Sequence, residues 1–153
     1  MLARLTDLHG FLRATLLGLV LVSIGGLALE LFLLEHTENR EQLVPLVALA
    51  VAFAATLVFL FAPSHATITM FRVVMLGVVG VGVLGLWFHY RGNAEFELEM
   101  MPGLRGRDLF LEAIRGATPA LAPGAIAQLG LLGFVLTLHH PRAHDATTRE
   151  MDI

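Results

Sequence analysis

The run ITMFRVVMLGVVGVGVLGLWFHY at positions 68–90 decides the fold class of this chain. Its apolar side chains are interrupted by the charge of Arg72, and Trp87 and Tyr90 lie at its end. Tryptophan and tyrosine are enriched where a membrane meets water. An apolar helix of about 20 residues crosses a hydrocarbon core of about 30 Å. The run therefore predicts a membrane-spanning helix.

Comparable apolar runs lie at about 11–34, 43–62 and 119–139. Hydrophobic residues make up 56% of the 153 residues and charged residues 15%, whereas soluble domains have about 45–50% and about 25%. We therefore expect an all-α membrane protein, a four-transmembrane-helix bundle formed by residues 1–141. Residues 142–153 are expected to be a short disordered cytoplasmic tail.

Composition also excludes several classes of protein. The net charge of −3 argues against a nucleic-acid binder. Cysteine is absent, which rules out disulfides and thiolate metal sites. The chain has no phosphate-binding loop, dinucleotide fingerprint or nucleophile motif, so no catalytic residue is assigned and the protein is expected not to be an enzyme.

The loop at 91–118 between the third and fourth spans is long and has structure of its own. Residues 95–100 alternate charged and apolar side chains, a period typical of an extended segment with one wet face. Residues 108–115 carry apolar side chains on one helical face, which predicts a short amphipathic helix lying flat in the interface and ended by Gly116. The outer side of the bundle is thus expected to be capped.

An even number of spans places both termini on one side of the membrane. Arginines are divided evenly between the two sides, with Arg4, Arg13, Arg72, Arg142 and Arg149 on the terminal side and Arg40, Arg91, Arg105, Arg107 and Arg115 opposite. The flanks of the first helix usually dominate orientation. Arg4 and Arg13 precede that helix and Arg40 follows it, so we expect a bacterial cytoplasmic membrane protein with cytoplasmic termini.

Two ionisable residues, Glu30 and His89, lie about one turn inside the outer ends of their spans. Each follows a glycine by four residues, Gly26 and Gly85 respectively, and membrane helices approach closely along faces of small residues. We therefore expect both side chains to point into the bundle at one level and to form a hydrogen bond or ion pair. Hydration near the headgroups and a ligand or proton site are the alternatives.

Gln128 is the third polar candidate and follows Gly124 by one turn, near the midplane of the fourth span, where it needs an interhelical partner. The glycines of the third span occupy more than one face of that helix. One chain buries one such face, so a second favours a homo-oligomer or a partner subunit. The candidate helix-packing residues are Gly26, Gly77, Gly80, Gly82, Gly85 and Gly124.

The outer side also carries possible metal ligands. Glu30, His36 and His89 combine carboxylate and imidazole groups, which bind divalent metals, and two histidines at one depth could hold a haem. Their spacing matches no strong metal motif. No cofactor is therefore predicted, and haem or a divalent metal is kept as the alternative. The acidic outer residues are Glu35, Glu38, Glu41, Glu95, Glu97 and Glu99.

These patterns favour a non-catalytic membrane subunit or scaffold that packs through glycine-rich helix faces and presents an acidic outer surface to a partner or ligand. Its surroundings are the lipid bilayer, and no nucleic acid is expected as a partner. The alternatives are a metal- or haem-binding redox or transport protein and a proton- or cation-coupled carrier that uses Glu30.

Overall fold

The computed structural model describes residues 2–116, 118–119 and 123–138, with side chains described from residue 10 onward. This part of the chain is all-helical. The helices are α1 (Leu2–Leu33), α2 (Arg40–Phe61), α3 (His65–Met100), α4 (Gly106–Arg115) and α5 (Gly124–Leu136). Three of them, α1 to α3, are long and apolar enough to cross a membrane. The first three predicted spans correspond to these helices.

Backbone hydrogen bonds end α1 sharply. The His36 N–H donates to the Leu31 carbonyl over 3.0 Å, and the Glu35 N–H donates to the Phe32 carbonyl over 3.1 Å. This pattern satisfies helix carbonyls when the residue after the helix is left-handed. Glu35 takes that conformation with φ 53°, in a position that glycine usually fills. The chain then turns back at once into α2.

The turn between α2 and α3 is fixed by a reciprocal cap. The Ser64 N–H donates to the Thr67 hydroxyl over 2.8 Å, and the Thr67 N–H donates to the Ser64 hydroxyl over 3.2 Å. Two backbone donors that have no partner within a helix are thereby satisfied. A proline at position 63 ends α2 just before this cap. Helices α2 and α3 are consequently antiparallel neighbours.

Helix α3 is longer than its apolar run. It has 36 residues, about 54 Å at 1.5 Å per residue, and it includes the segment at 95–100. The prediction that this segment is extended is wrong. A lone strand leaves its backbone unpaired, whereas glutamate, leucine and methionine are good helix formers and the first helix breaker is Pro102.

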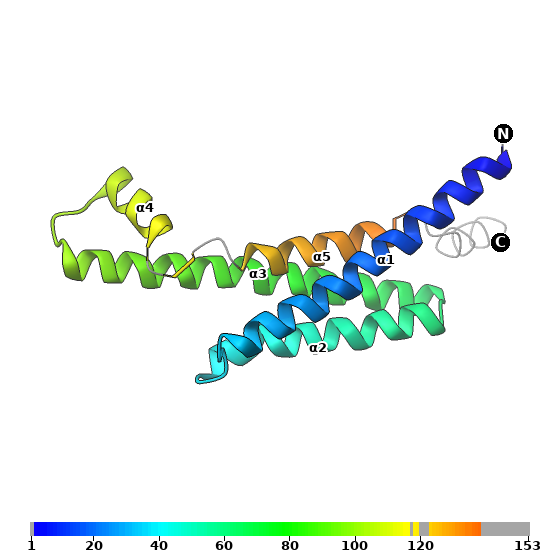
Figure 1. Ribbon diagram of the computed structural model, residues 1–153, viewed down its shortest axis with the longest axis horizontal. Coiled ribbons are helices and arrows are strands. Elements are labelled where there is room, and N and C mark those ends of the chain that lie inside the picture. The colour runs from blue at the N-terminus through cyan, green and yellow to red at the C-terminus, as the bar shows by residue number, and fades with distance from the viewer. Residues whose placement is uncertain (1, 117, 120–122, 139–153) are drawn as a thin grey trace, which may run out of the picture.

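Helix α3 is the central element of the fold (Figure 1). Helices α5, α2 and α4 pack against it, whereas α1 packs on α5 and α2. Phe59 and Phe71 stack between α2 and α3 with ring centroids 4.8 Å apart. Figure 1 also shows the start of α1, the α2–α3 turn and the end of α5 at one end of the molecule. Helices α1 and α3 therefore start at the end of the molecule at which α2 and α5 stop.

Large apolar side chains cover the outside of the bundle. Phe61 is 78% exposed, and Val22 and Phe32 are more than two-thirds exposed. Exposed large apolar side chains in this number are unfavourable in water, and lipid is the solvent that suits them. The described part of the chain is therefore that of a helical membrane protein.

The fourth predicted span is only partly matched by a helix. Helix α5 has 13 residues, about 20 Å, where the sequence predicts a span at 119–139. Positions 120–122 and 139 lie outside the described residues, as does the predicted tail at 142–153.

The short amphipathic helix is confirmed as α4, which begins two positions earlier than expected and ends before Gly116. It packs against α3 instead of lying flat by itself. The Tyr90 and Phe110 rings approach to 5.8 Å between the two helices. Helix α4 and the end of α3 thus form a helical hairpin, which we call the outer hairpin (residues 91–116).

Candidate functional site

A groove between α1 and α5 brings two of the predicted polar residues together. Its volume is about 430 Å³. Its polar side chains are Glu30 and Ser23 from α1 and Gln128 from α5. Gly26 leaves room on the α1 wall because no other atom lies within 4 Å of the place where a Cβ would stand. The apolar walls are formed by Leu27, Leu129 and Leu132, with Ala125 beside them.

Neither Glu30 nor Gln128 has a protein partner in the groove. Among the described residues, neither side chain forms a hydrogen bond or an ion pair, and both side chains are exposed. Gln128 therefore lacks the interhelical bond that its depth led us to expect. A charged group within a membrane span is costly and usually marks a site or a partner. The groove is the best candidate site in the described part of the chain.

The expected Glu30–His89 contact is not formed. His89 Nδ1 lies 3.2 Å from the carbonyl oxygen of Pro119, in the segment between α4 and α5. Glu30 instead faces α5, because α1 packs on α5 and α2. The two residues sit near the same end of the bundle on helices that are not principal neighbours.

The proposed metal ligands are not gathered either. No group of three histidine, aspartate or glutamate side chains converges on one point within the described residues. Glu30 lines the groove, His89 is engaged by Pro119, and His36 follows α1 in the turn. Three separate environments do not make the coordination shell that a divalent metal needs.

Glycines on α3 have two different roles. A Cβ at Gly82 would lie 2.3 Å from the backbone nitrogen of Ala127, and one at Gly85 would lie 2.7 Å from Pro123. These glycines let α5 approach the backbone of α3, and Gly124 lies at the same contact. At Gly77 and Gly80 a Cβ would meet nothing within 4 Å. One glycine face is filled within the chain and the other is open.

Two glycines on α5 complete the contact with α3. A Cβ at Gly130 would lie 2.6 Å from the carbonyl oxygen of Met75, and one at Gly133 would lie 2.5 Å from the Met75 sulfur. Both glycines are buried. Neither glycine was among the predicted packing residues, and their spacing of three residues does not match the four-residue spacing of the usual close-packing motif.

Asn93 fastens the outer hairpin and was not predicted to do so. Its side chain is 3% exposed. The amide nitrogen donates to the carbonyls of Ala113 at 2.9 Å and Thr118 at 2.7 Å. The amide oxygen accepts from the Thr118 hydroxyl at 2.5 Å and the Thr118 N–H at 3.2 Å. All of the hydrogen-bonding capacity of the amide is used, and we call this set of contacts the Asn93 latch.

A matching contact lies at the opposite end of α5. Arg72 Nε donates to the Thr137 hydroxyl over 2.8 Å, and Nη2 donates to the Thr137 carbonyl over 2.9 Å. Thr137 is fully buried. A guanidinium group at a helix C-terminus satisfies free carbonyls and interacts favourably with the helix dipole. The one charge within the third apolar run therefore ties α3 to the end of α5.

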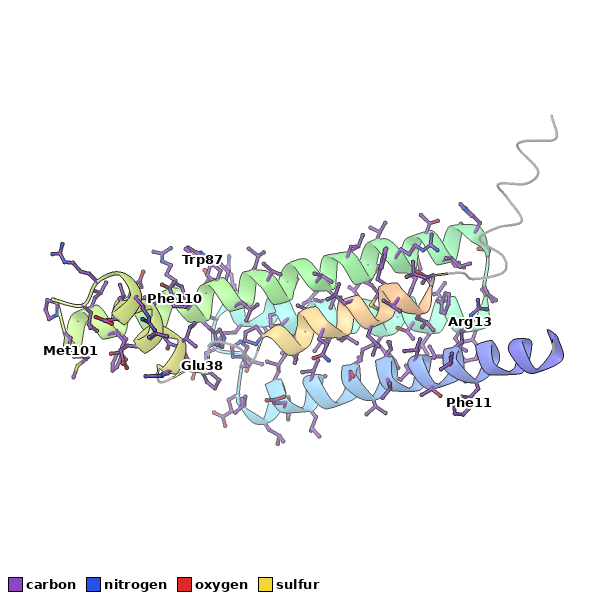
Figure 2. The ribbon with its side chains drawn as sticks, turned by 90° about the horizontal axis from the view of Figure 1, so that it is seen from above. Phe11, Arg13, Glu38, Trp87, Met101 and Phe110 are labelled. Atoms are coloured by element: carbon purple, nitrogen blue, oxygen red, sulfur yellow. The ribbon has the colours of Figure 1, made fainter. Side chains whose placement is uncertain are left out.

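Figure 2 shows how these features lie along the molecule. Glu38, in the α1–α2 turn, and Trp87 occupy similar positions along the long axis, and Arg13 lies toward the other end. Met101 and Phe110 lie further out than Trp87. The outer hairpin thus extends past Trp87 along the long axis of the molecule.

Comparison with known proteins gives no match: no family model fits the chain, and no curated protein or solved structure is significantly similar to it. The class to which the protein belongs therefore rests on its own features. They are three long apolar helices and an apolar exterior, which define a helical membrane protein.

Proposed function

We propose that this protein is a non-catalytic membrane subunit or scaffold that spans the bilayer four times. The observation that carries the proposal is the division of the α3 glycines. Gly82 and Gly85 are filled by α5, whereas Gly77 and Gly80 remain open on another face. Glycine is unfavourable in a helix unless close packing uses it. An open glycine face within a membrane span therefore suits a second copy or a partner helix.

The Asn93 latch and the Arg72 contact support the fourth crossing. Thr118 is held beside Asn93, and Thr137 is held beside Arg72. Asn93 and Arg72 are about 32 Å apart along α3 at 1.5 Å per residue, close to the hydrocarbon thickness of about 30 Å. Thr118 and Thr137 are thus held at two levels of α3 whose separation matches the thickness of a bilayer, which supports a fourth crossing although α5 itself is short.

The flanks of the first helix, which usually dominate orientation, support cytoplasmic termini. Arg13 lies in the first helix and Arg72 near the start of α3, at the end where α5 stops. The outer hairpin then faces the opposite compartment. There Glu97 and Glu99 extend beyond the Arg91–Glu95 ion pair of 2.8 Å, and they add to the acidic residues of the α1–α2 turn. The segments 35–42 and 91–118 together hold eight acidic and five basic side chains, and this net negative charge suits a basic partner.

A carrier receives less support from the same geometry. A transported proton or cation needs polar groups across the whole bundle. The polar residues of the groove end at Ser23. Further along, Thr56 is buried and its hydroxyl donates to the Ala52 carbonyl over 2.6 Å. Toward the inner end, Arg72 and Thr137 likewise bond to each other. In the described helices the groove therefore does not continue as a polar path to the inner end.

Leucine at both Gly77 and Gly80 tests the assembly. The added side chains would overpack a helix contact, which costs about 1–3 kcal/mol and would weaken association about tenfold to a hundredfold. We expect light scattering in detergent to show wild-type protein above the single-chain mass of 16.6 kDa and the variant near that mass. Thermal stability of the chain should change little.

Gly92→Leu is the matched control, because Gly92 is also open on α3 but lies in the outer hairpin. It should leave the assembled mass unchanged. Wild-type protein of single-chain mass with no co-purified membrane subunit would contradict the proposal. So would a Gly77/Gly80 variant that retains the wild-type mass.

A further inference from the structure

The groove between α1 and α5 has the composition of a binding site for one kind of ligand. Glu30 supplies a carboxylate that has no counterion among the described residues. Gln128 supplies an amide on the facing helix and Ser23 a hydroxyl deeper along α1. An unpaired carboxylate at this depth is unfavourable in lipid, and a cation in the groove would relieve that cost.

The charges around the groove favour a cation over an anion. No basic side chain is among the residues that line it. The preceding arginine on α1 is Arg13, about 26 Å along the helix. Arg91, on α3, is engaged by Glu95. The described residues therefore give the Glu30 carboxylate no positive partner, and a ligand would supply that positive charge.

The walls exclude a bare metal ion and favour an apolar ligand body. Divalent metals need several carboxylate, carbonyl or imidazole ligands, and Glu30 is the single carboxylate that lines the groove. Apart from Glu30, Gln128 and Ser23, the lining is apolar, with Leu27, Leu129 and Leu132 as its large side chains. A volume of about 430 Å³ lies within the range of about 300–1,000 Å³ that small-molecule sites occupy.

The groove lies at a depth that molecules dissolved in the outer half of the bilayer can reach. Ala127, next to Gln128, contacts Gly82 on α3, about two turns of helix below the aromatic belt at Trp87 and Tyr90. Glu30 lies nearer the end of α1. A ligand would therefore place its charge near Glu30 and its apolar body against the leucines.

We propose that the groove between α1 and α5 binds an amphiphilic organic cation, with the positive centre at Glu30 and Gln128 and the apolar body against Leu27, Leu129 and Leu132. This proposal concerns a face of the bundle other than the open glycine face of α3. It is independent of the assembly proposed above.

Equilibrium dialysis of tetraphenylphosphonium against the full chain in nanodiscs of zwitterionic lipid tests the site. We expect saturable binding at one cation per chain. Glu30→Gln keeps the shape of the side chain and removes its charge, and it should weaken binding about tenfold or more, the loss given by one charge-assisted contact. Glu38→Gln, in the α1–α2 turn outside the groove, is the matched control and should bind as wild type does.

A second variant, which blocks the groove sterically, tests the site even if Glu30→Gln alters folding. Ala125→Trp fills the groove and leaves the carboxylate in place, so it should abolish saturable binding. The fluorescence of Trp87, the single natural tryptophan, reports whether Glu30→Gln and Glu38→Gln are folded. Absence of saturable binding to wild-type protein would overturn the proposal. Equal affinity of wild type, Glu30→Gln and Ala125→Trp would do the same.

Discussion

Gly82→Ala is expected to lower the free energy of unfolding by about 3 kcal/mol, at the upper end of the range for overpacking. The new Cβ would lie 2.3 Å from the backbone nitrogen of Ala127. A backbone atom cannot rotate away as the end of a side chain can, so α5 has to move off α3. The loss should appear in unfolding by sodium dodecyl sulfate followed by circular dichroism, although alanine favours a helix over glycine by about 1 kcal/mol.

Gly92→Ala is the control for this prediction. Gly92 lies on the same helix outside the proposed assembly face, and a Cβ there meets nothing within 4 Å. Its stability should be unchanged or raised by up to about 1 kcal/mol. Opposite effects at the two positions identify Gly82 as the internal contact. Similar losses at both positions would contradict the α3–α5 packing.

Asn93→Leu is expected to release the outer hairpin and leave the bundle intact. The leucine cannot bond the carbonyls of Ala113 and Thr118 or the Thr118 N–H. Each buried polar group left without a partner costs about 1–3 kcal/mol. The hairpin should open, because opening lets water bond the unpaired groups. Hydrogen exchange in α4 should therefore accelerate about a hundredfold or more.

Two observations separate this local effect from general unfolding. Exchange within α2 should stay at the wild-type rate, and trypsin should cut at Arg107 in α4 earlier than in wild type. Gly92→Ala serves as the control, because a Cβ at Gly92 meets no other atom within 4 Å. Unchanged protection of α4 in Asn93→Leu would mean that the latch does not hold the hairpin.

Hydropathy was sufficient to predict the apolar part of each long helix, because the length of that part follows from the thickness of a bilayer. It failed at residues 95–100, where alternating charged and apolar side chains suggested an extended segment. That pattern has no partner strand to pair with, and the backbone continues the helix from the apolar run. The Asn93 latch was missed for a related reason: its partner Thr118 is distant in the sequence, and the contact exists only if α3 extends past Tyr90.

The neighbours of each helix could not be predicted from depth alone. Glu30 and His89 were matched because both lie near the outer ends of their spans. Hydropathy gives the level of a residue but not the order of helices around a bundle, and α1 packs on α5 and α2. Glu30 therefore shares a groove with Gln128. The two glycine faces of α3 were predicted, but the sequence could not say which face would be internal.

Membrane topology tests the central claim most directly, and the absence of cysteine makes the natural chain a ready background. Single cysteines would be introduced at Glu38 and Gly103 on the proposed outer side and at His65 and Ala146 on the proposed inner side. A membrane-impermeant maleimide should label the first pair in intact cells and the second pair only after permeabilisation. Labelling of Gly103→Cys and His65→Cys from one side would contradict the crossing by α3, and labelling of Gly103→Cys and Ala146→Cys from one side would contradict the fourth span.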